Sequence, residues 1–76
     1  MKADKNRIKE LVADVLEISV SEIGDDSEFV TDLAMNSLQM LDCVAEIEDE
    51  YDIRIPRAAI RDLTSVSRVT AYIEEL

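Results

Sequence analysis

The 76-residue sequence has no histidine and no tryptophan, and it contains one glycine, one proline and one cysteine. Without histidine, a Ser-His or Cys-His catalytic pair is excluded, and neither a cluster of metal ligands nor a glycine-rich phosphate loop is present. The lone Cys43 cannot form an internal disulfide, and its expected role is that of a small apolar residue in or near the core. We therefore expect neither an enzyme nor a metal site.

Basic residues are missing from the middle of the chain. From Glu10 to Asp52 there are fourteen acidic residues and no lysine or arginine, and the formal net charge is −10. This charge repels nucleic acid phosphates and anionic lipid headgroups, so neither nucleic acid nor membrane insertion is expected, and the complementary partner is a basic protein surface. Nothing resembles a signal peptide or a membrane-spanning run, which predicts a cytoplasmic location. The segment DDSEFVTD lacks the pattern of an EF-hand loop and is expected to bind divalent ions weakly at best.

The scarcity of glycine, proline and aromatic residues favours helices over a turn-rich sheet. The length predicts one domain, 1–76, and the fold class is all-α: a small bundle of three main helices plus one short helix, with a long first connecting loop. Helical periodicity places one apolar stripe in each main helix. The first stripe, after a cap at Asp4, comprises Ile8, Leu11, Val12, Val15 and Leu16; the last, after a cap at Thr64 or Ser65, comprises Val66, Val69, Tyr72, Ile73 and Leu76.

The second helix is expected to begin at Asn36 or Ser37 and to run to about Tyr51. Its predicted apolar side comprises Leu38, Leu41, Val44, Ala45, Ile47 and Tyr51. Pro56 cannot continue a helix, so a break and a short helical turn from Arg57 to Leu63 follow. The connection over residues 17–36 is long for a compact domain, and loops of this kind are often functional. Five apolar residues are expected to anchor it to the core, namely Ile18, Ile23, Phe29, Val30 and Leu33.

Ser37 has two possible roles at the start of this helix. Serine is a good N-cap, and a capping role requires no further function. Asn36 can take that role instead, with Gln39 as the reciprocal partner in a capping box, which would leave the Ser37 hydroxyl exposed. A phosphodiester on that hydroxyl would be stabilised by the positive end of the helix dipole. From these features alone, capping is the stronger interpretation.

An ordered set of motifs resembles the acyl carrier protein family over nearly the whole chain. These motifs are Phe29-Val30, Asp32-Leu33, Ser37-Leu38, an acidic second helix ending EIEDEYDIRIP, Leu63-Thr64 and Tyr72-Ile73. The resemblance implies a carrier and not an enzyme, and it favours modification of Ser37 over a capping role. In that family a transferase joins 4'-phosphopantetheine from coenzyme A to the serine, and the thiol of the arm holds acyl intermediates as thioesters. The cofactor then supplies the reactive group and the protein presents it.

The resemblance also implies partners and a binding surface. The expected partners of this monomer are a phosphopantetheinyl transferase and acyl-processing enzymes with basic docking patches, in fatty acid, polyketide or related biosynthesis. The residues expected to contact them are Asn36, Leu38, Met40, Asp42, Glu46, Glu48, Asp49 and Glu50. Six residues could border a space that shelters the acyl chain, and each could equally be an ordinary core residue: Phe29, Val44, Ile47, Ile55, Leu63 and Tyr72. Met40 likewise could be a simple core or boundary residue.

Two departures from the family pattern suggest a carrier specialised for one pathway. The family commonly has Gly-Ala-Asp-Ser-Leu or Gly-Phe/Met-Asp-Ser-Leu, where this chain has Ala34-Met35-Asn36-Ser37-Leu38, so the transferase meets a neutral Asn36. The turn after Pro56 is usually acidic in fatty acid carriers, and here it holds Arg57 and Arg61. An alternative function remains: an unmodified acidic helical docking module that binds a basic protein partner while Ser37 only caps.

Overall fold

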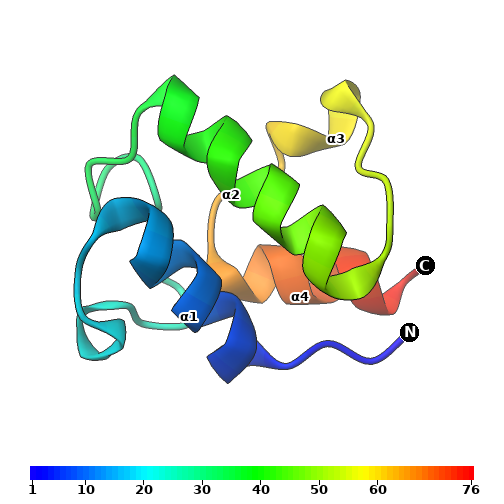
Figure 1. The fold of residues 1–76 in the computed structure, drawn as a ribbon, viewed down its shortest axis with the longest axis horizontal. Coiled ribbons are helices and arrows are strands. Elements are labelled where there is room, and N and C mark those ends of the chain that lie inside the picture. The colour runs from blue at the N-terminus through cyan, green and yellow to red at the C-terminus, as the bar shows by residue number, and fades with distance from the viewer.

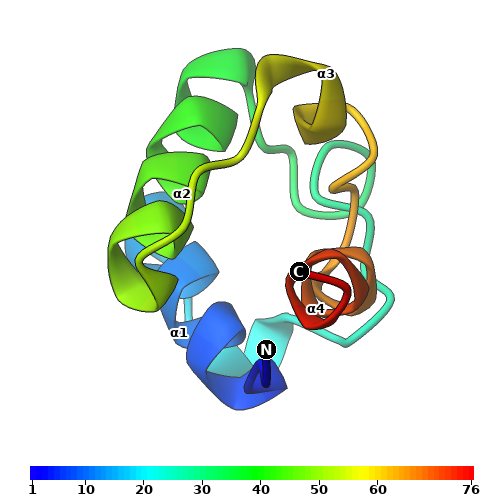
Figure 2. The same ribbon diagram turned by 90° about the vertical axis from the view of Figure 1, so that its right-hand side faces the viewer.

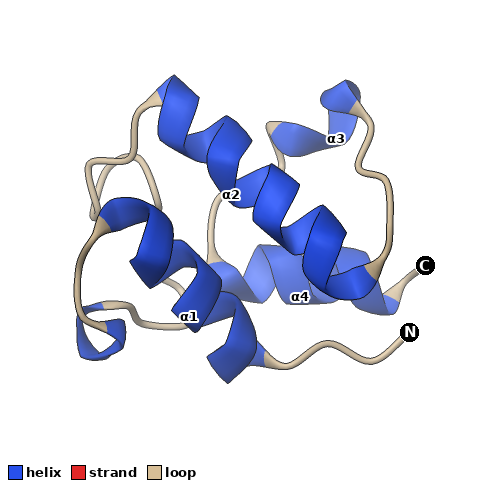
Figure 3. Ribbon diagram, viewed as in Figure 1, coloured by secondary structure: helices blue, strands red, loops and turns tan.

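Helices account for all the regular structure of the protein, as Figure 3 shows. The computed structural model describes all residues, Met1–Leu76. The elements in chain order are α1 (Lys5–Leu16), a short 3-10 turn η1 (Val20–Glu22), α2 (Ser37–Tyr51), α3 (Arg57–Ile60) and α4 (Val66–Glu74) (Figure 1). This arrangement confirms the predicted all-α class with three main helices and one short one. The short helix ends earlier than the predicted Leu63, and η1 was not predicted.

The helix starts follow the capping residues in the sequence. The Asp4 carboxylate accepts hydrogen bonds from the backbone N–H groups of Asn6 and Arg7, and the Ser65 hydroxyl accepts one from Arg68. Both side chains satisfy N–H groups that lack a partner inside the helix. The predicted cap at Asp4 is confirmed, and of the two candidates Thr64 and Ser65 the cap of α4 is Ser65.

The core lies between α1, α2 and α4, with α1 packed against both of the other two (Figures 1 and 2). Its largest fully buried side chains are Phe29, Ile8, Ile47 and Ile73. Phe29 comes from the long connection, which packs onto the core as expected. Its backbone N–H donates to the Thr64 carbonyl at 2.9 Å, and the Ser67 N–H donates to the Asp25 carbonyl at 2.9 Å, so the connection is tied to the segment before α4 and to α4 itself.

Several residues predicted to face the core are exposed. Val30 is 65% exposed, Leu38 68% and Leu41 55%, and Ala45 and Leu76 are also exposed. The buried residues of α2 are instead Cys43, Val44 and Ile47. Phe29 and Met35 of the connection are buried in the core, whereas Leu38 and Leu41 near the N-terminal end of α2 are exposed. Leu76 lies beyond the end of α4. No helix has both the length and the apolar composition to cross a membrane.

Candidate functional site

Ser37 is the first residue of α2, and its side chain is exposed. Asn36 caps the helix: its Oδ1 accepts from the Gln39 N–H at 2.8 Å, and the Gln39 Oε1 accepts from the Asn36 N–H at 2.9 Å. This reciprocal pair is the predicted capping box. The Ser37 hydroxyl takes part in no hydrogen bond of the protein, so it is not needed as a cap and is accessible.

Ser37 stands at the edge of an apolar hollow of about 570 Å³. Residues from the connection, from α2 and from α3 form its lining: Val30, Met35, Asn36, Ser37, Met40, Leu41 and Ile60. Ser37 therefore lines the same hollow as two residues that were predicted to contact partners, Asn36 and Met40. Leu38, also predicted, is exposed outside this lining. Val30, Leu41 and Ile60 were not predicted as site residues, because their shared position depends on how the connection and α3 pack.

A smaller hollow of about 180 Å³ shares Val30, Met40 and Ile60 with the first. Two residues of the predicted acyl-chain set, Phe29 and Leu63, contribute to it, together with the polar residues Glu28, Thr31, Arg61 and Thr64. The other members lie elsewhere. Val44, Ile47 and Ile55 are buried in the core and line neither hollow, and Tyr72 lines a separate surface depression with Leu63.

Three of the predicted acidic contact residues border one groove between α1 and α2. Asp42, Glu46 and Asp49 lie with Asp14 around a hollow of about 400 Å³ whose lining also includes Val15 and Ala45. Asp14 comes from α1 and was not predicted, because its proximity to α2 depends on helix packing. No group of three or more His, Cys, Asp or Glu side chains is arranged to hold a metal ion.

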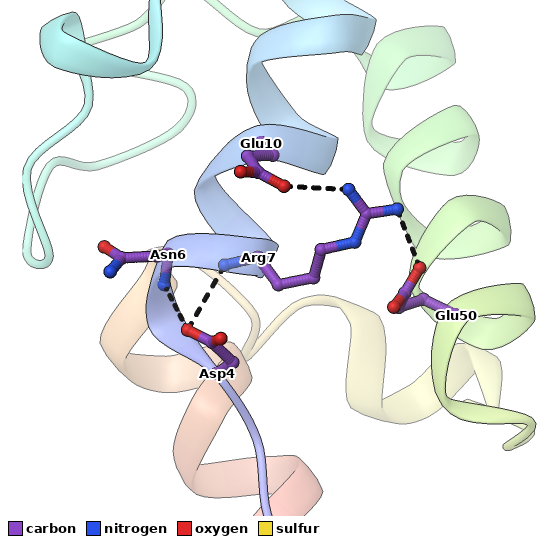
Figure 4. Close-up of polar contacts among 5 residues, drawn as sticks. All are labelled: Asp4, Asn6, Arg7, Glu10 and Glu50. Atoms are coloured by element: carbon purple, nitrogen blue, oxygen red, sulfur yellow. Dashed lines mark hydrogen bonds and ion pairs between the residues drawn. The ribbon is translucent and has the colours of Figure 1, made fainter.

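The other two predicted acidic residues make contacts within the protein. The Glu48 Oε2 accepts from the Ile55 N–H at 2.7 Å and so holds the segment between α2 and α3. The Glu50 Oε1 lies 2.9 Å from the Arg7 Nη2, and the Glu10 Oε1 lies 2.8 Å from the Arg7 Nη1 (Figure 4). The hydrogen bond from Arg7 lowers the pKa of Glu50 below its usual value. Part of the acidic surface of α2 therefore serves the fold.

Cys43 is only 1% exposed, as expected for a core residue. Burial, with smaller contributions from Asp42 and Glu46, raises its pKa to about 12. Because thiolates and not thiols are nucleophiles, Cys43 is unreactive at neutral pH. Ser37, in contrast, is exposed and lines the apolar hollow.

Comparison with known proteins adds independent findings. The family model described as "Phosphopantetheine attachment site" matches residues 6–73. The polyketide-8 synthase acyl carrier protein 2 of Streptomyces avermitilis is 41% identical over 63 residues, which cover 83% of this chain and 72% of that protein. The acyl carrier protein of Clostridium acetobutylicum is 34% identical over 68 residues, covering 90% of this chain and 88% of that protein. The meromycolate extension acyl carrier protein of Mycobacterium bovis is 38% identical over 69 residues, which are 91% of this chain but only 60% of that relative.

Proposed function

The chain belongs to the acyl carrier protein family, and on this basis we propose that Ser37 is the residue that bears its prosthetic group. Members of the family are non-catalytic carriers in fatty acid and polyketide biosynthesis. The 4'-phosphopantetheine group supplies a thiol on which acyl intermediates are held as thioesters. The protein interacts with the biosynthetic enzymes that process them.

The accessibility of the Ser37 hydroxyl is the observation that carries the assignment. Asn36 and Gln39 satisfy the cap, so the hydroxyl can be esterified without loss of a hydrogen bond. The phosphodiester would lie at the positive end of α2, which has no acidic residue in its first turn to oppose the charge. Val30, Met40 and Ile60 offer an apolar surface beside the attachment point.

We further propose that Asp42, Glu46 and Asp49 form the main acidic docking surface, joined by Asp14 of α1. All four are exposed and form no ion pair within the protein. A phosphopantetheinyl transferase and acyl-processing enzymes with basic patches would bind here. Exposed charge pairs accelerate encounter and contribute little to lasting affinity, which suits a carrier that must release each enzyme. Glu48 and Glu50 contribute less because they are already engaged.

Several finer features complete the proposal. Residues 1–76 act as one monomeric carrier domain in the cytoplasm, and the cargo is a fatty acyl or polyketide intermediate. Phe29 and Leu63 border the hollow that receives the first part of the cargo. Val44, Ile47 and Ile55 contact the cargo only if the helices separate, because all three are buried in the core. Tyr72 contacts it only if the cargo reaches the separate depression that Tyr72 lines with Leu63.

The test is the intact mass of the protein after incubation with coenzyme A and a broad-specificity phosphopantetheinyl transferase. We expect the parent to gain one phosphopantetheine and Ser37→Ala to gain none, while Ser67→Ala, a matched serine on α4, gains one like the parent. Asn36→Asp should be modified faster, since it restores the carboxylate common in the family. No gain in either the parent or Asn36→Asp would contradict the assignment and would favour an unmodified docking module.

A further inference from the structure

Arg57 is the first residue of α3 and Arg61 directly follows its last residue; like Arg54 and Arg68, both differ from the basic residues of α1 in forming no ion pair. All four ion pairs of the structure involve Lys5, Arg7 or Lys9 on α1. Arg57 and Arg61 are exposed and form no ion pair, although the chain carries 18 carboxylate side chains. Two unpaired positive charges, four residues apart on so acidic a protein, are therefore available to an external carboxylate.

The helix α3, with these two charges at its ends, lies close to the hollow that Ser37 lines. In Figures 1 and 2, α3 and the N-terminal end of α2 both lie at the top of the view. Ile60 of α3 and Ser37 of α2 line the same hollow, and Arg61 lines the smaller hollow that shares Ile60 with it. An enzyme that receives an arm from Ser37 must cover this end of the protein and so comes close to α3.

The two sides of this region carry opposite charge. Asp42 and Glu46 on α2 are negative and unpaired, and Arg57 and Arg61, at the two ends of α3, are positive and unpaired. Exposed Val30 and half-buried Met40 line the hollows between α2 and α3. A partner with only basic residues would be attracted by α2 and repelled by α3. A partner with both signs in matching places would bind in a single orientation.

We propose that Arg57 and Arg61 form a basic docking element that contacts carboxylates of the partner enzyme, opposite in sign to the acidic surface of α2. The partner would then present basic residues to α2, acidic residues to α3 and an apolar side chain to the hollow between them. The inference rests on the proposed carrier function. It identifies the partner as an enzyme with a bipolar docking surface.

The test uses charge reversal with a matched control. Arg57→Glu/Arg61→Glu changes the formal net charge from −10 to −14, and so does Arg54→Glu/Arg68→Glu, in which both arginines are likewise exposed and unpaired. The probe is the acyltransferase of the same organism that transfers an acyl group from coenzyme A to the phosphopantetheine-bearing carrier. Each variant is first shown by intact mass to carry the prosthetic group and by circular dichroism to be folded. Failure to carry it would count against the proposed function and not against the docking element.

We expect Arg57→Glu/Arg61→Glu to lower kcat/KM about tenfold or more, mainly through KM, and Arg54→Glu/Arg68→Glu to lower it less than about threefold. Arg57→Lys/Arg61→Lys should retain most of the parent value, because it keeps both charges. Equal losses in the two reversal variants would mean that only net charge matters, and no loss would mean that α3 is not contacted. A loss for transfer of a malonyl group but not of an acetyl group would assign the arginines to the cargo carboxylate. Each of these three outcomes would overturn the proposal.

Discussion

The two ends of α2 differ in their contacts: one packs against the rest of the protein, and the other is exposed. Near its C-terminal end, Glu50 is bound by Arg7 of α1, and the Tyr51 hydroxyl accepts from the Asp4 N–H at 3.0 Å. Near its N-terminal end, Leu38 and Leu41 are more than half exposed, and the Ser37 hydroxyl has no partner. The C-terminal end of α2, with Glu50 and Tyr51, therefore contacts α1 and the segment before it, and we call it the closed end. The N-terminal end, with Ser37, Leu38 and Leu41, has exposed side chains, and we call it the open end.

The difference between the two ends of α2 follows from which helices pack against each end. α1 contacts both α2 and α4, whereas α3 contains no buried residue. Large apolar side chains left exposed together mark an interaction surface more often than a defect in packing. The open end therefore fits a protein that repeatedly binds and releases partners, and the closed end maintains the fold during those encounters.

Two neighbouring residues of the connection between α1 and α2 differ strongly in exposure. Phe29 is 1% exposed and Val30 is 65% exposed. Phe29→Ala removes a large core side chain and should lower the free energy of unfolding by about 3–5 kcal/mol. Val30→Ala should change it by less than about 0.5 kcal/mol. Urea denaturation followed by circular dichroism measures both, and equal effects would break the distinction between core and open surface.

Cys43 tests whether the buried side of α2 stays closed in solution. With its pKa raised to about 12 from a usual 9.0, the thiolate fraction at pH 8 falls about a thousandfold. Alkylation by iodoacetamide at pH 8 should therefore be slower by about that factor in the native protein than in urea. The double variant Leu41→Cys/Cys43→Ala moves the thiol to an exposed position and should react quickly. Rapid native labelling of Cys43 would indicate an open core.

The capping box at the open end should contribute measurably to stability. Asn36→Ala removes the acceptor for the Gln39 N–H and should cost about 1 kcal/mol of unfolding free energy. Asn36→Asp keeps an acceptor, adds favourable charge at the helix start and should be at least as stable as the parent. Equal destabilisation by the two substitutions would show that the cap contact is unimportant.

Ala34, just before the site, has a left-handed backbone with φ of 57°. An alanine in this region is strained relative to glycine, the residue common at this position in the family, so Ala34→Gly should raise the unfolding free energy by up to about 1 kcal/mol. Ala58→Gly, within α3, should instead lower stability, because glycine is a poor helix former. Chemical denaturation distinguishes the two signs, and destabilisation by Ala34→Gly would contradict this account.

The smallest expected effect concerns the ion pair at the closed end. The Arg7 hydrogen bond lowers the pKa of Glu50, so the carboxylate favours folding above its usual pKa of 4.5, and this contribution is lost as the pH falls through the lower native value. Arg7→Gln should return the Glu50 pKa toward 4.5, with little change in stability because the pair is exposed. Side-chain NMR titration measures the shift. Arg54→Gln, which removes an unpaired arginine, should leave Glu50 unchanged.

The local features of the fold were predictable because they depend on residues close in sequence. Asp4 was identified as a cap from side-chain chemistry, and Phe29 was identified as an anchor of the connection. For α2 the residues alone favoured Ser37 as the cap and gave Asn36 as the alternative, and the alternative is the one that the structure shows. Leu38 and Leu41 were misassigned to the core, because periodicity defines an apolar stripe but cannot show which part of the stripe other segments cover. The proximity of Ile60 and Asp14 to α2 could not be predicted from the sequence either, because it arises from packing between elements that are distant in the chain.

The central claim, that the open end of α2 presents the prosthetic group on Ser37, is tested most directly by locating the modification. No lysine or arginine lies between residues 10 and 53, so trypsin releases a peptide of residues 10–54 that contains Ser19, Ser21, Ser27 and Ser37. Fragmentation of this peptide from the modified protein by tandem mass spectrometry assigns the added mass to one residue. The account predicts phosphopantetheine on Ser37 alone. Its attachment to any other serine, or its absence from this peptide, would contradict the claim.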